Sequence, residues 1–222
     1  MQVCTINLDF VVRAKADPDL KRILNQSDLN VPDGFPIVLM GRLQGYGLKE
    51  RVAGADIIPM LMALAAEHGA RVFLLGGEGG SAQVAAHQLQ QRLPDLVVAG
   101  SYEPPRASID EMDNEAIVRL IDESRADVLL VALGNPKQEK WIARYRARLG
   151  VSVAIGVGCC FDLMAGRVSR APRWMQACGT EWLFRLVNEP GRLASRYLKD
   201  LWGLTFIAPP LVWHRVSRIG RS

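Results

Sequence analysis

Polar residues that could bind a ligand follow an apolar run in the middle of the chain. Residues 128–133 are continuously apolar, which is typical of a strand buried on both faces of a parallel sheet. Gly134 and Asn135 end this run, Pro136 fits the first position of a helix, and Gln138 follows in the opening turn. Parallel sheets bind ligands where their strands end, and helix N-termini favour phosphate. The segment therefore predicts an anion site, with an ordinary strand-to-helix turn as the alternative.

Asp33 is a candidate general base. It follows a short apolar segment at residues 29–31 and precedes Gly34. A carboxylate at the end of a strand can face a cleft and take a proton from a substrate. An aspartate ahead of glycine is also a common turn residue, and the local sequence alone favours the turn.

A glycine-rich turn offers a second place for a phosphate. Gly76-Gly77-Glu78-Gly79-Gly80-Ser81 separates a predicted strand at residues 71–75 from a predicted helix that ends at Arg92. Backbone N–H groups in such a turn can hold a diphosphate. The turn lacks a strict G-x-G-x-x-G spacing, and no acidic residue closes the next strand to bind a ribose. These features disfavour NAD and leave the binding of another nucleotide open.

The residue types predict no metal centre and no bound cofactor. The four cysteines have no C-x-x-C spacing, and the three histidines are scattered singly. Asp17-Pro18-Asp19 has the D-x-D spacing of metal-dependent transferases, but a helix cap followed by a first-turn proline explains these residues better. We expect reduced core thiols at Cys4, Cys159, Cys160 and Cys178.

Predicted strands and helices alternate along the chain, which indicates an α/β, Rossmann-like fold with a mostly parallel sheet and helices on both faces. Strands are expected at residues 1–7, 71–75, 96–99, 128–133 and 151–157, and short apolar segments stand at residues 29–31 and 37–40. Helices are expected from residues 8 and 18 and at 56–68, 81–92, 110–124, 136–149, 172–177, 181–188 and 192–202, with a loop at 41–54. We divide the chain into a core, residues 1–178, and a C-terminal helical appendage, residues 179–222, with a break at Pro209-Pro210.

Positive charge is concentrated in the appendage. Residues 185–222 contain seven basic and two acidic residues, whereas the rest of the chain contains 20 basic and 21 acidic residues. Composition alone does not choose between nucleic acid and an anionic membrane. Aromatic residues such as Trp182, Tyr197 and Trp202 alternate with the basic ones, as at a lipid headgroup interface. No signal peptide or membrane-spanning run is visible, so we expect attachment to a membrane to be peripheral.

Four stretches of the chain resemble the WecG/TagA/CpsF family of bacterial glycosyltransferases. They are Val3-Cys-Thr-Ile-Asn7, Pro32-Asp-Gly34 with Glu50-Arg-Val-Ala-Gly-Ala-Asp56, Gly134-Asn-Pro-Lys-Gln-Glu-Lys-Trp141, and residues 156–190. The likeness covers most of the chain in order. Family members usually have a further strand and helix before the first stretch, so we expect a shortened form or a missing start.

The resemblance implies an inverting, metal-independent hexosyltransferase. It would move a sugar from a UDP-sugar (N-acetylmannosamine-like, glucose or a uronic acid) to a polyprenyl-diphosphate-linked sugar at the cytoplasmic face of the cell membrane. The resemblance therefore implies anionic inner-leaflet lipids as partners and no nucleic-acid partner. Such products serve teichoic acid, enterobacterial common antigen or exopolysaccharide synthesis. The implied general base is Asp33, which outweighs the turn interpretation. Thr5, Asn7 and Gln138 match family positions that line the sugar pocket, and Asn135 is a further substrate-binding candidate. Arg185, Arg192 and Arg196 are suited to stabilise the departing UDP.

Two other functions remain as alternatives. An NAD(P)-dependent Rossmann oxidoreductase would need a ribose-binding acid and a catalytic Tyr, His or Lys constellation, and neither is evident. A non-catalytic membrane-surface scaffold would use only the basic appendage. The sequence does not name the donor sugar, because few contacts distinguish one sugar from another. A homo-oligomer is also compatible with it.

Overall fold

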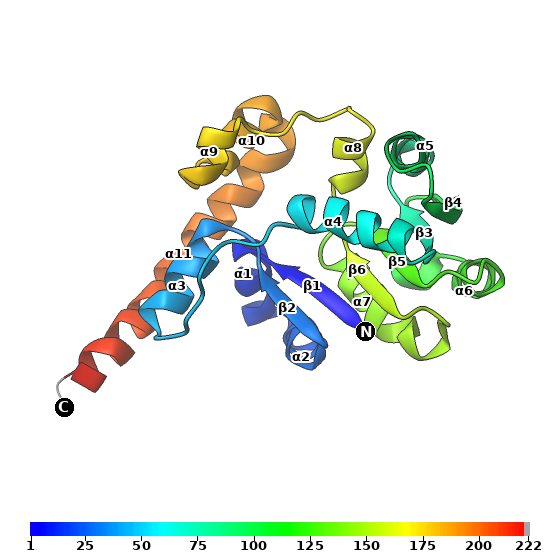
Figure 1. The fold of residues 1–222 in the computed structure, drawn as a ribbon. Coiled ribbons are helices and arrows are strands. Elements are labelled where there is room, and N and C mark those ends of the chain that lie inside the picture. The colour runs from blue at the N-terminus through cyan, green and yellow to red at the C-terminus, as the bar shows by residue number, and fades with distance from the viewer. Residues whose placement is uncertain (220–222) are drawn as a thin grey trace. The chain divides into compact units, whose positions relative to one another are not determined.

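A computed structural model describes residues 1–219, without the side chains of Arg192 and residues 206–219. The chain forms a six-stranded sheet with helices around it (Figure 1). The strand order is β2-β1-β6-β5-β3-β4, and the pairs β1–β6, β6–β5, β5–β3 and β3–β4 are parallel. This arrangement confirms the predicted α/β, Rossmann-like fold.

Most of the predicted elements are present. The strands are β1 (Gln2–Ile6), β2 (Leu29–Pro32), β3 (Arg71–Gly76), β4 (Val97–Tyr102), β5 (Val128–Ala132) and β6 (Val153–Gly156). The helices up to β5 are α1 (Leu8–Ala16), α2 (Pro18–Gln26), α3 (Phe35–Leu43), α4 (Gly54–Glu67), α5 (Ser81–Arg92), η1 (Ile109–Glu111) and α6 (Asn114–Glu123). Those that follow are α7 (Lys137–Tyr145), η2 (Arg146–Arg148), α8 (Cys160–Met164), α9 (Arg173–Ala177), α10 (Glu181–Asn188) and α11 (Pro190–Ile219).

Three elements differ from the prediction. Helix α3 includes residues expected as an apolar segment and the start of a loop, because Pro36 in its first turn favours a helix start. The short helix α8 was not predicted. Helix α11 continues through Pro209 and Pro210, so the predicted break was wrong. Each proline there removes only one backbone hydrogen bond, and a helix can continue past such a loss.

The chain divides into two compact units. Unit 1 consists of Met1–Thr5, Asp19–Asn30 and Gly54–Ser169. Unit 2 consists of Ile6–Pro18, Val31–Ala53 and the residues from Arg170 onward. The core boundary expected at residue 178 stays a prediction.

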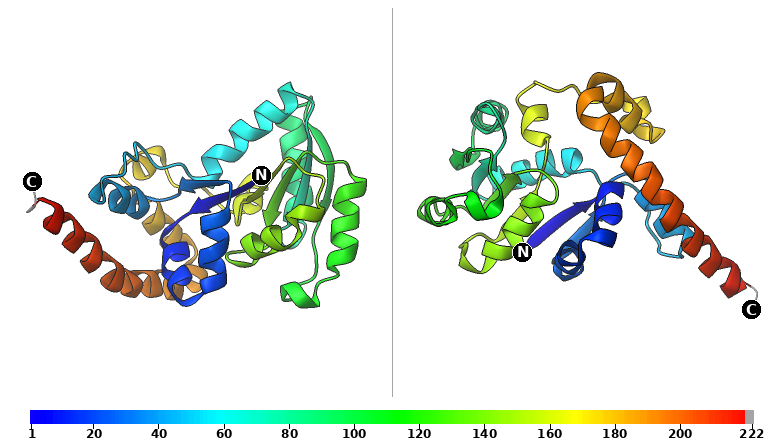
Figure 2. Two further views of the ribbon diagram at one scale, coloured as in Figure 1. Left: turned by 90° about the horizontal axis from the view of Figure 1, so that it is seen from below. Right: turned by 180° about the vertical axis from the view of Figure 1, so that it is seen from behind.

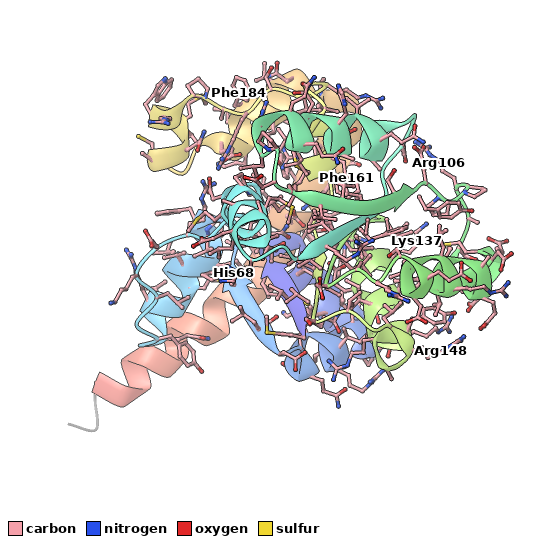
Figure 3. The ribbon with its side chains drawn as sticks, turned by 45° about the vertical axis from the view of Figure 1, so that its right-hand side comes forward. His68, Arg106, Lys137, Arg148, Phe161 and Phe184 are labelled. Atoms are coloured by element: carbon pink, nitrogen blue, oxygen red, sulfur yellow. The ribbon has the colours of Figure 1, made fainter. Side chains whose placement is uncertain are left out.

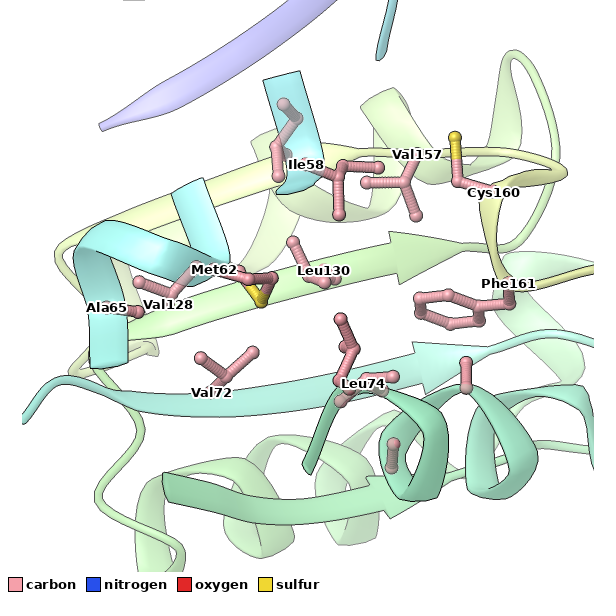
Figure 4. Packing of buried hydrophobic residues seen from close by; sticks show 14 of the residues in the cluster. Ile58, Met62, Ala65, Val72, Leu74, Val128, Leu130, Val157, Cys160 and Phe161 are labelled. Atoms are coloured by element: carbon pink, nitrogen blue, oxygen red, sulfur yellow. The ribbon is translucent and has the colours of Figure 1, made fainter. Parts of the chain in front are cut away.

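The core of unit 1 lies on both faces of its strands. Val72, Leu74 and Leu130 pack with α4, α5 and α8 on one face (Figure 4). Phe73 and Leu75 pack with α6 and α7 on the other face. Successive residues of a strand point to opposite faces of the sheet, and here helices cover both faces. Every position of a central strand is therefore apolar, which explains the continuous apolar runs in the sequence.

Unit 2 is built around the long helix α11, which Figure 2 shows as one continuous helix that curves in the left view. Helix α11 packs against α1, α3 and α10. Leu193 on α11 is buried, whereas Leu198, Leu201 and Trp202 on the same helix are exposed. Among residues 1–219, no helix combines the length and the hydrophobicity that a membrane crossing needs.

Candidate active site

The sheet has a topological switch point between β3 and β5. The chain leaves β3 through α5 toward β4, and it leaves β5 through α7 in the opposite direction toward β6. Helices α5 and α7 accordingly pack on opposite faces of the sheet. Open α/β sheets bind ligands outside the carboxyl ends of the strands at such a point. The loops after β3 and β5 are therefore the first place to look for a site.

These two loops are in direct contact. The Gly77 N–H donates to the Ala132 carbonyl at the end of β5 (2.9 Å). A Cβ on Gly76, whose φ is 97°, would lie 2.5 Å from the same carbonyl oxygen. Glycine is required here because any side chain would force the ends of β3 and β5 apart.

Charged side chains that the sequence analysis missed hold the loop after β3. Arg106 forms an ion pair with Glu78 and is labelled in Figure 3. Arg167 donates to the carbonyls of Glu78 (2.6 Å) and of the next residue (2.5 Å). The Glu103 carboxylate accepts the Gly80 N–H (2.7 Å). These partners are separated by 23 to 89 positions in sequence, so no local motif could identify them.

The loop after β5 leads to Gln138, which is buried at the start of α7. Helix α7 begins one residue later than predicted, with Pro136 as its N-cap and Asn135 before it. The Gln138 Nε2 donates to Glu139 Oε1 (2.7 Å), and Gln138 Oε1 accepts the Gly158 N–H (3.2 Å). Gln138 thus links the start of α7 to the loop that follows β6.

Thr5 lies near the end of β1 and is buried. A Cβ on Gly54 would lie 3.6 Å from the Thr5 methyl group and 3.9 Å from the Cys160 sulfur, so these three residues are neighbours. Strands β1 and β6 are paired and parallel. Thr5 therefore lies at the same edge of the sheet as Gly158, the partner of Gln138.

Asn7 and Asp33 are brought together in unit 2. The Asp33 N–H donates to the Ile6 carbonyl (2.7 Å), which places Asp33 beside the residue that precedes Asn7. The Asn7 Oδ1 accepts the Phe10 N–H (3.3 Å) and caps α1. The predicted base and one predicted sugar-binding residue are therefore adjacent, and Asn7 also has a structural role.

The three predicted UDP-binding arginines have different surroundings. Arg185 is half-buried on α10, and Arg192 lies in the first turn of α11 with a side chain outside the described part. The Arg196 Nε lies 3.4 Å from Asp9 Oδ2 and 4.0 Å from Asp200 Oδ2. Two carboxylates thus offset the charge of Arg196, and its part in UDP binding stays a prediction.

Arg196 belongs to a buried charge cluster that joins α1 and α11. The Arg13 Nε donates to Asp9 Oδ1 (2.8 Å), and Asp9 and Asp200 are only 4% and 5% exposed. Burial, followed by the negative charge of Asp9, raises the pKa of Asp200 from 3.8 to about 6. The attachment of α11 to α1 therefore includes a carboxyl group that ionises only at some cost.

The substitution Asp200→Asn is expected to stabilise the protein above about pH 6 and to change little near pH 4. A raised pKa means that the folded state binds the proton more tightly, so stability falls as the pH rises from 3.8 to about 6. Asparagine resembles the protonated form and removes this loss. We expect Tm at about pH 7.5 to rise by about 2–6 °C, measured by thermal unfolding. Lys199→Gln, an exposed neighbour, is the control. An equal change in Tm at both pH values would contradict the assignment.

A second ion pair in unit 2 involves Arg51. This residue lies in one of the four stretches that resemble the family, but the sequence predicted no role for it. The Arg51 Nη1 donates to Glu181 Oε2 on α10 (2.6 Å). The Arg170 Nε lies 3.9 Å from the other Glu181 oxygen. Because Arg51 and Glu181 are 130 positions apart, local spacing could not reveal the pair.

The described residues contain no group of three or more His, Cys, Asp or Glu side chains placed to hold a metal ion. Asp19, from the D-x-D sequence, pairs with Arg22 on α2 (2.5 Å), and Asp17 is the C-cap of α1. The cysteines are free thiols: Cys4 and Cys160 are buried as predicted, whereas Cys159 is half-buried and Cys178 is exposed, so the prediction of a core position was wrong for Cys178. Burial raises the pKa of Cys4 to about 12, with a further contribution from Glu139, so Cys4 is not a nucleophile near neutral pH.

Comparison with known proteins decides the family. The chain matches the family described as Glycosyl transferase WecG/TagA/CpsF over residues 1–218. The chain belongs to the WecG/TagA/CpsF family. It is 33% identical over 190 residues to an N-acetylglucosaminyldiphosphoundecaprenol N-acetyl-beta-D-mannosaminyltransferase of Bacillus subtilis (strain 168), covering 86% of this chain and 72% of the relative. A protein with the same name from Bacillus spizizenii (strain ATCC 23059 / NRRL B-14472 / W23) is 30% identical over 190 residues, which again cover 86% of this chain and 72% of the relative.

Membership in the WecG/TagA/CpsF family confirms the resemblance found in four stretches of the sequence. It favours sugar transfer over the NAD(P)-dependent oxidoreductase alternative. The structure brings together Asn7 with Asp33 in unit 2, and Thr5 with the Gln138–Gly158 link in unit 1. The role of each of these residues in sugar transfer stays a prediction.

Proposed function

We propose that this chain transfers an N-acetylmannosamine-like sugar from a UDP-sugar to a polyprenyl-diphosphate-linked sugar, with inversion at the transferred carbon. The names of both Bacillus relatives specify an N-acetyl-β-D-mannosaminyl group and an N-acetylglucosaminyldiphosphoundecaprenol acceptor. The observation that carries the proposal is the hydrogen bond from Asp33 to Ile6, which places a carboxylate residue next to Asn7 at the ends of β1 and β2. Glucose and a uronic acid are the alternative donor sugars.

Asp33 is the proposed general base. A hydroxyl group is a poor nucleophile, so a base must take its proton during the attack. The acceptor oxygen forms a bond to the anomeric carbon, Asp33 takes the proton, and the bond between that carbon and the UDP oxygen breaks. UDP leaves with the bonding electrons. Attack on the face opposite to UDP inverts the configuration of the anomeric carbon.

The other predicted residues have roles that fit their chemistry. Thr5, Asn7, Asn135 and Gln138 carry neutral donors and acceptors, which suit sugar hydroxyls and an N-acetyl group. Arg185, Arg192 and Arg196 are proposed to stabilise the negative charge of departing UDP. In unit 1 the 12-residue helix α5 begins directly after the 76–80 loop, and Arg106 and Arg167 lie beside that loop. The carboxylates of Glu78 and Glu103 balance these two positive charges, and Glu103 already accepts the Gly80 N–H, so the diphosphate is proposed at the arginines of unit 2.

Catalysis is expected to proceed without a divalent metal ion. Arginines and helix N-termini can supply the positive charge that a metal would otherwise supply to UDP. Adding EDTA in excess over contaminating metal should leave the initial rate of UDP release within about twofold of the untreated rate. Activity that disappears with EDTA and returns with Mn²⁺ or Mg²⁺ would contradict this proposal.

We further propose that unit 2 attaches peripherally to the cytoplasmic face of the membrane through anionic lipids. Exposed aromatic and aliphatic side chains are frequent on its last three helices. They are Trp174, Trp182, Leu183, Val187, Leu198, Leu201 and Trp202. Such side chains beside basic residues suit a lipid headgroup region. Phe206 and Trp213, which the sequence also suggested, have side chains outside the described part.

The donor sugar is tested by a screen of UDP-sugars. The purified protein is incubated with an N-acetylglucosaminyl diphosphate lipid and one UDP-sugar at a time. We expect the highest rate of UDP release with UDP-N-acetylmannosamine. A higher rate with UDP-glucose or with a UDP-uronic acid would assign the alternative donor.

A further inference from the structure

Glu139 is a buried acidic residue that the proposed chemistry does not use. It is 1% exposed, and the neighbouring Gln138 is 3% exposed. Its Oε1 accepts a hydrogen bond from the Gln138 Nε2 (2.7 Å). A carboxyl group is costly to bury, so its retention next to Gln138 suggests a purpose beyond packing.

The Gln138 amide is held from two sides. Its nitrogen faces the Glu139 carboxyl group, and its oxygen accepts the Gly158 N–H (3.2 Å). A flipped amide would place oxygen against the Glu139 oxygen and an N–H against the Gly158 N–H. Both contacts would be repulsive, so the two partners determine which way the amide points. The Gln138 Nε2 carries two hydrogens, and the hydrogen bond to Glu139 uses only one of them.

Gly156 gives these two side chains their space. A Cβ at this position would lie 2.5 Å from the Gln138 Nε2 and would also collide with Glu139 Oε1. Both atoms are the far ends of side chains, so an added methyl group would move the side chains and not the backbone. Gly156 is the last residue of β6. A small residue is therefore required at this point for the observed amide position.

Strand β1 contacts the backbone of Glu139. The Gln2 Nε2 donates to the Glu139 carbonyl (3.1 Å). Gln2 is 1% exposed and Cys4 is fully buried. The charge of Glu139 contributes, after burial, to the raised pKa of the Cys4 thiol on β1. These contacts hold the start of α7 against β1.

We propose that Glu139 is a positioning residue for sugar transfer: it orients the Gln138 amide so that one Nε2 hydrogen remains available for an oxygen of the sugar. The inference rests on the proposed function, in which Gln138 contacts the sugar. Glu139 itself would not touch the substrate. Its removal should therefore affect transfer only through Gln138.

A double-mutant cycle tests this dependence. Gln138→Ala and Glu139→Ala should each lower kcat/KM for transfer by ~10–100-fold, the usual effect of a misplaced contact. The double variant should be no slower than Gln138→Ala alone, because Glu139 acts through Gln138. Glu139→Gln should be faster than Glu139→Ala, because its amide oxygen can still accept the Gln138 N–H. Affinity for UDP, measured by calorimetry, should not change in any of these variants.

Gly156→Ala is an independent test that leaves both polar side chains in place. The added methyl group should displace the Gln138 amide and lower kcat/KM to about the level of Gln138→Ala. Gly47→Ala is the matched control, because a Cβ there meets nothing within 4 Å. Thermal unfolding of every variant shows whether the fold is retained. The free energies of unfolding of Gln138→Ala, Glu139→Ala and the double variant are then compared in the same way as their kcat/KM values.

The outcomes separate this inference from the proposed function. Coupling between the two substitutions in both unfolding and transfer would support it. Independent, multiplying losses of kcat/KM, or additive effects on unfolding, would overturn it while the wild type still transfers sugar. A wild type that transfers no sugar from any UDP-sugar would instead overturn the proposed function, and with it the role of Glu139.

Discussion

Asp33→Asn is expected to lower the turnover of sugar transfer by ~10²–10⁴-fold, the range associated with loss of a general base. Asparagine keeps the shape of the side chain and removes its ability to take a proton. The hydrogen bond from the Asp33 N–H to the Ile6 carbonyl does not involve the side chain, so this bond should be retained. UDP release under single-turnover conditions measures the effect, and UDP affinity should change little.

Asp19→Asn is the matched control for this prediction. Asp19 belongs to the D-x-D sequence, and its side chain is 52% exposed and paired with Arg22. A surface pair of this kind contributes little, so the control should keep wild-type turnover. If Asp33→Asn retained more than half of wild-type turnover, another residue would have to be the base. A large loss in Asp19→Asn would instead direct attention to a metal bound at the D-x-D sequence.

Replacement of Leu198, Leu201 and Trp202 by glutamate is expected to weaken binding to anionic liposomes by at least ~100-fold. The three side chains are 68%, 59% and 70% exposed on α11, so they are available for lipid. Each contributes apolar area to binding, and each glutamate adds repulsion from anionic headgroups. Cosedimentation with anionic vesicles at moderate salt measures the change.

The control for the liposome experiment is Met60→Glu with Leu64→Glu on α4 of unit 1. These side chains are 69% and 53% exposed, so they are as accessible as the residues on α11. They should have no effect if attachment depends on unit 2. A triple variant of α11 that still cosediments, or an equal loss in the α4 control, would contradict attachment through α11. The substituted side chains are exposed, so the fold of unit 2 should be retained.

Short-range signals in the sequence were sufficient for most strands and most helices. The apolar run at residues 128–133 predicted β5, which ends at Ala132, because a strand covered by helices on both faces needs apolar residues at every position. Helix α3 was missed because Gly41 and the glycines after it were interpreted as a loop. Helix α11 was predicted too short because Pro209-Pro210 was interpreted as a break.

Contacts between residues that are distant in sequence leave no local signal in the sequence. Arg196 was assigned to UDP from its charge and its place in the appendage, yet it lies beside Asp9, which is near the other end of the chain. The same limit applies to Arg167, which reaches the carbonyl of Glu78 across 89 positions. Spacing in the sequence carries information about one helix or one strand, whereas these pairs depend on how helices and strands pack.

Detection of the glycosylated lipid tests the central claim most directly. The protein is incubated with UDP-N-acetylmannosamine and an N-acetylglucosaminyl diphosphate polyprenyl lipid, and the lipid product is analysed by mass spectrometry and by NMR of its anomeric proton. We predict a mass increase of one N-acetylhexosamine, a β-linkage, and UDP release that requires the acceptor. An unchanged lipid with every UDP-sugar, or UDP release at the same rate without the acceptor, would contradict the proposed function.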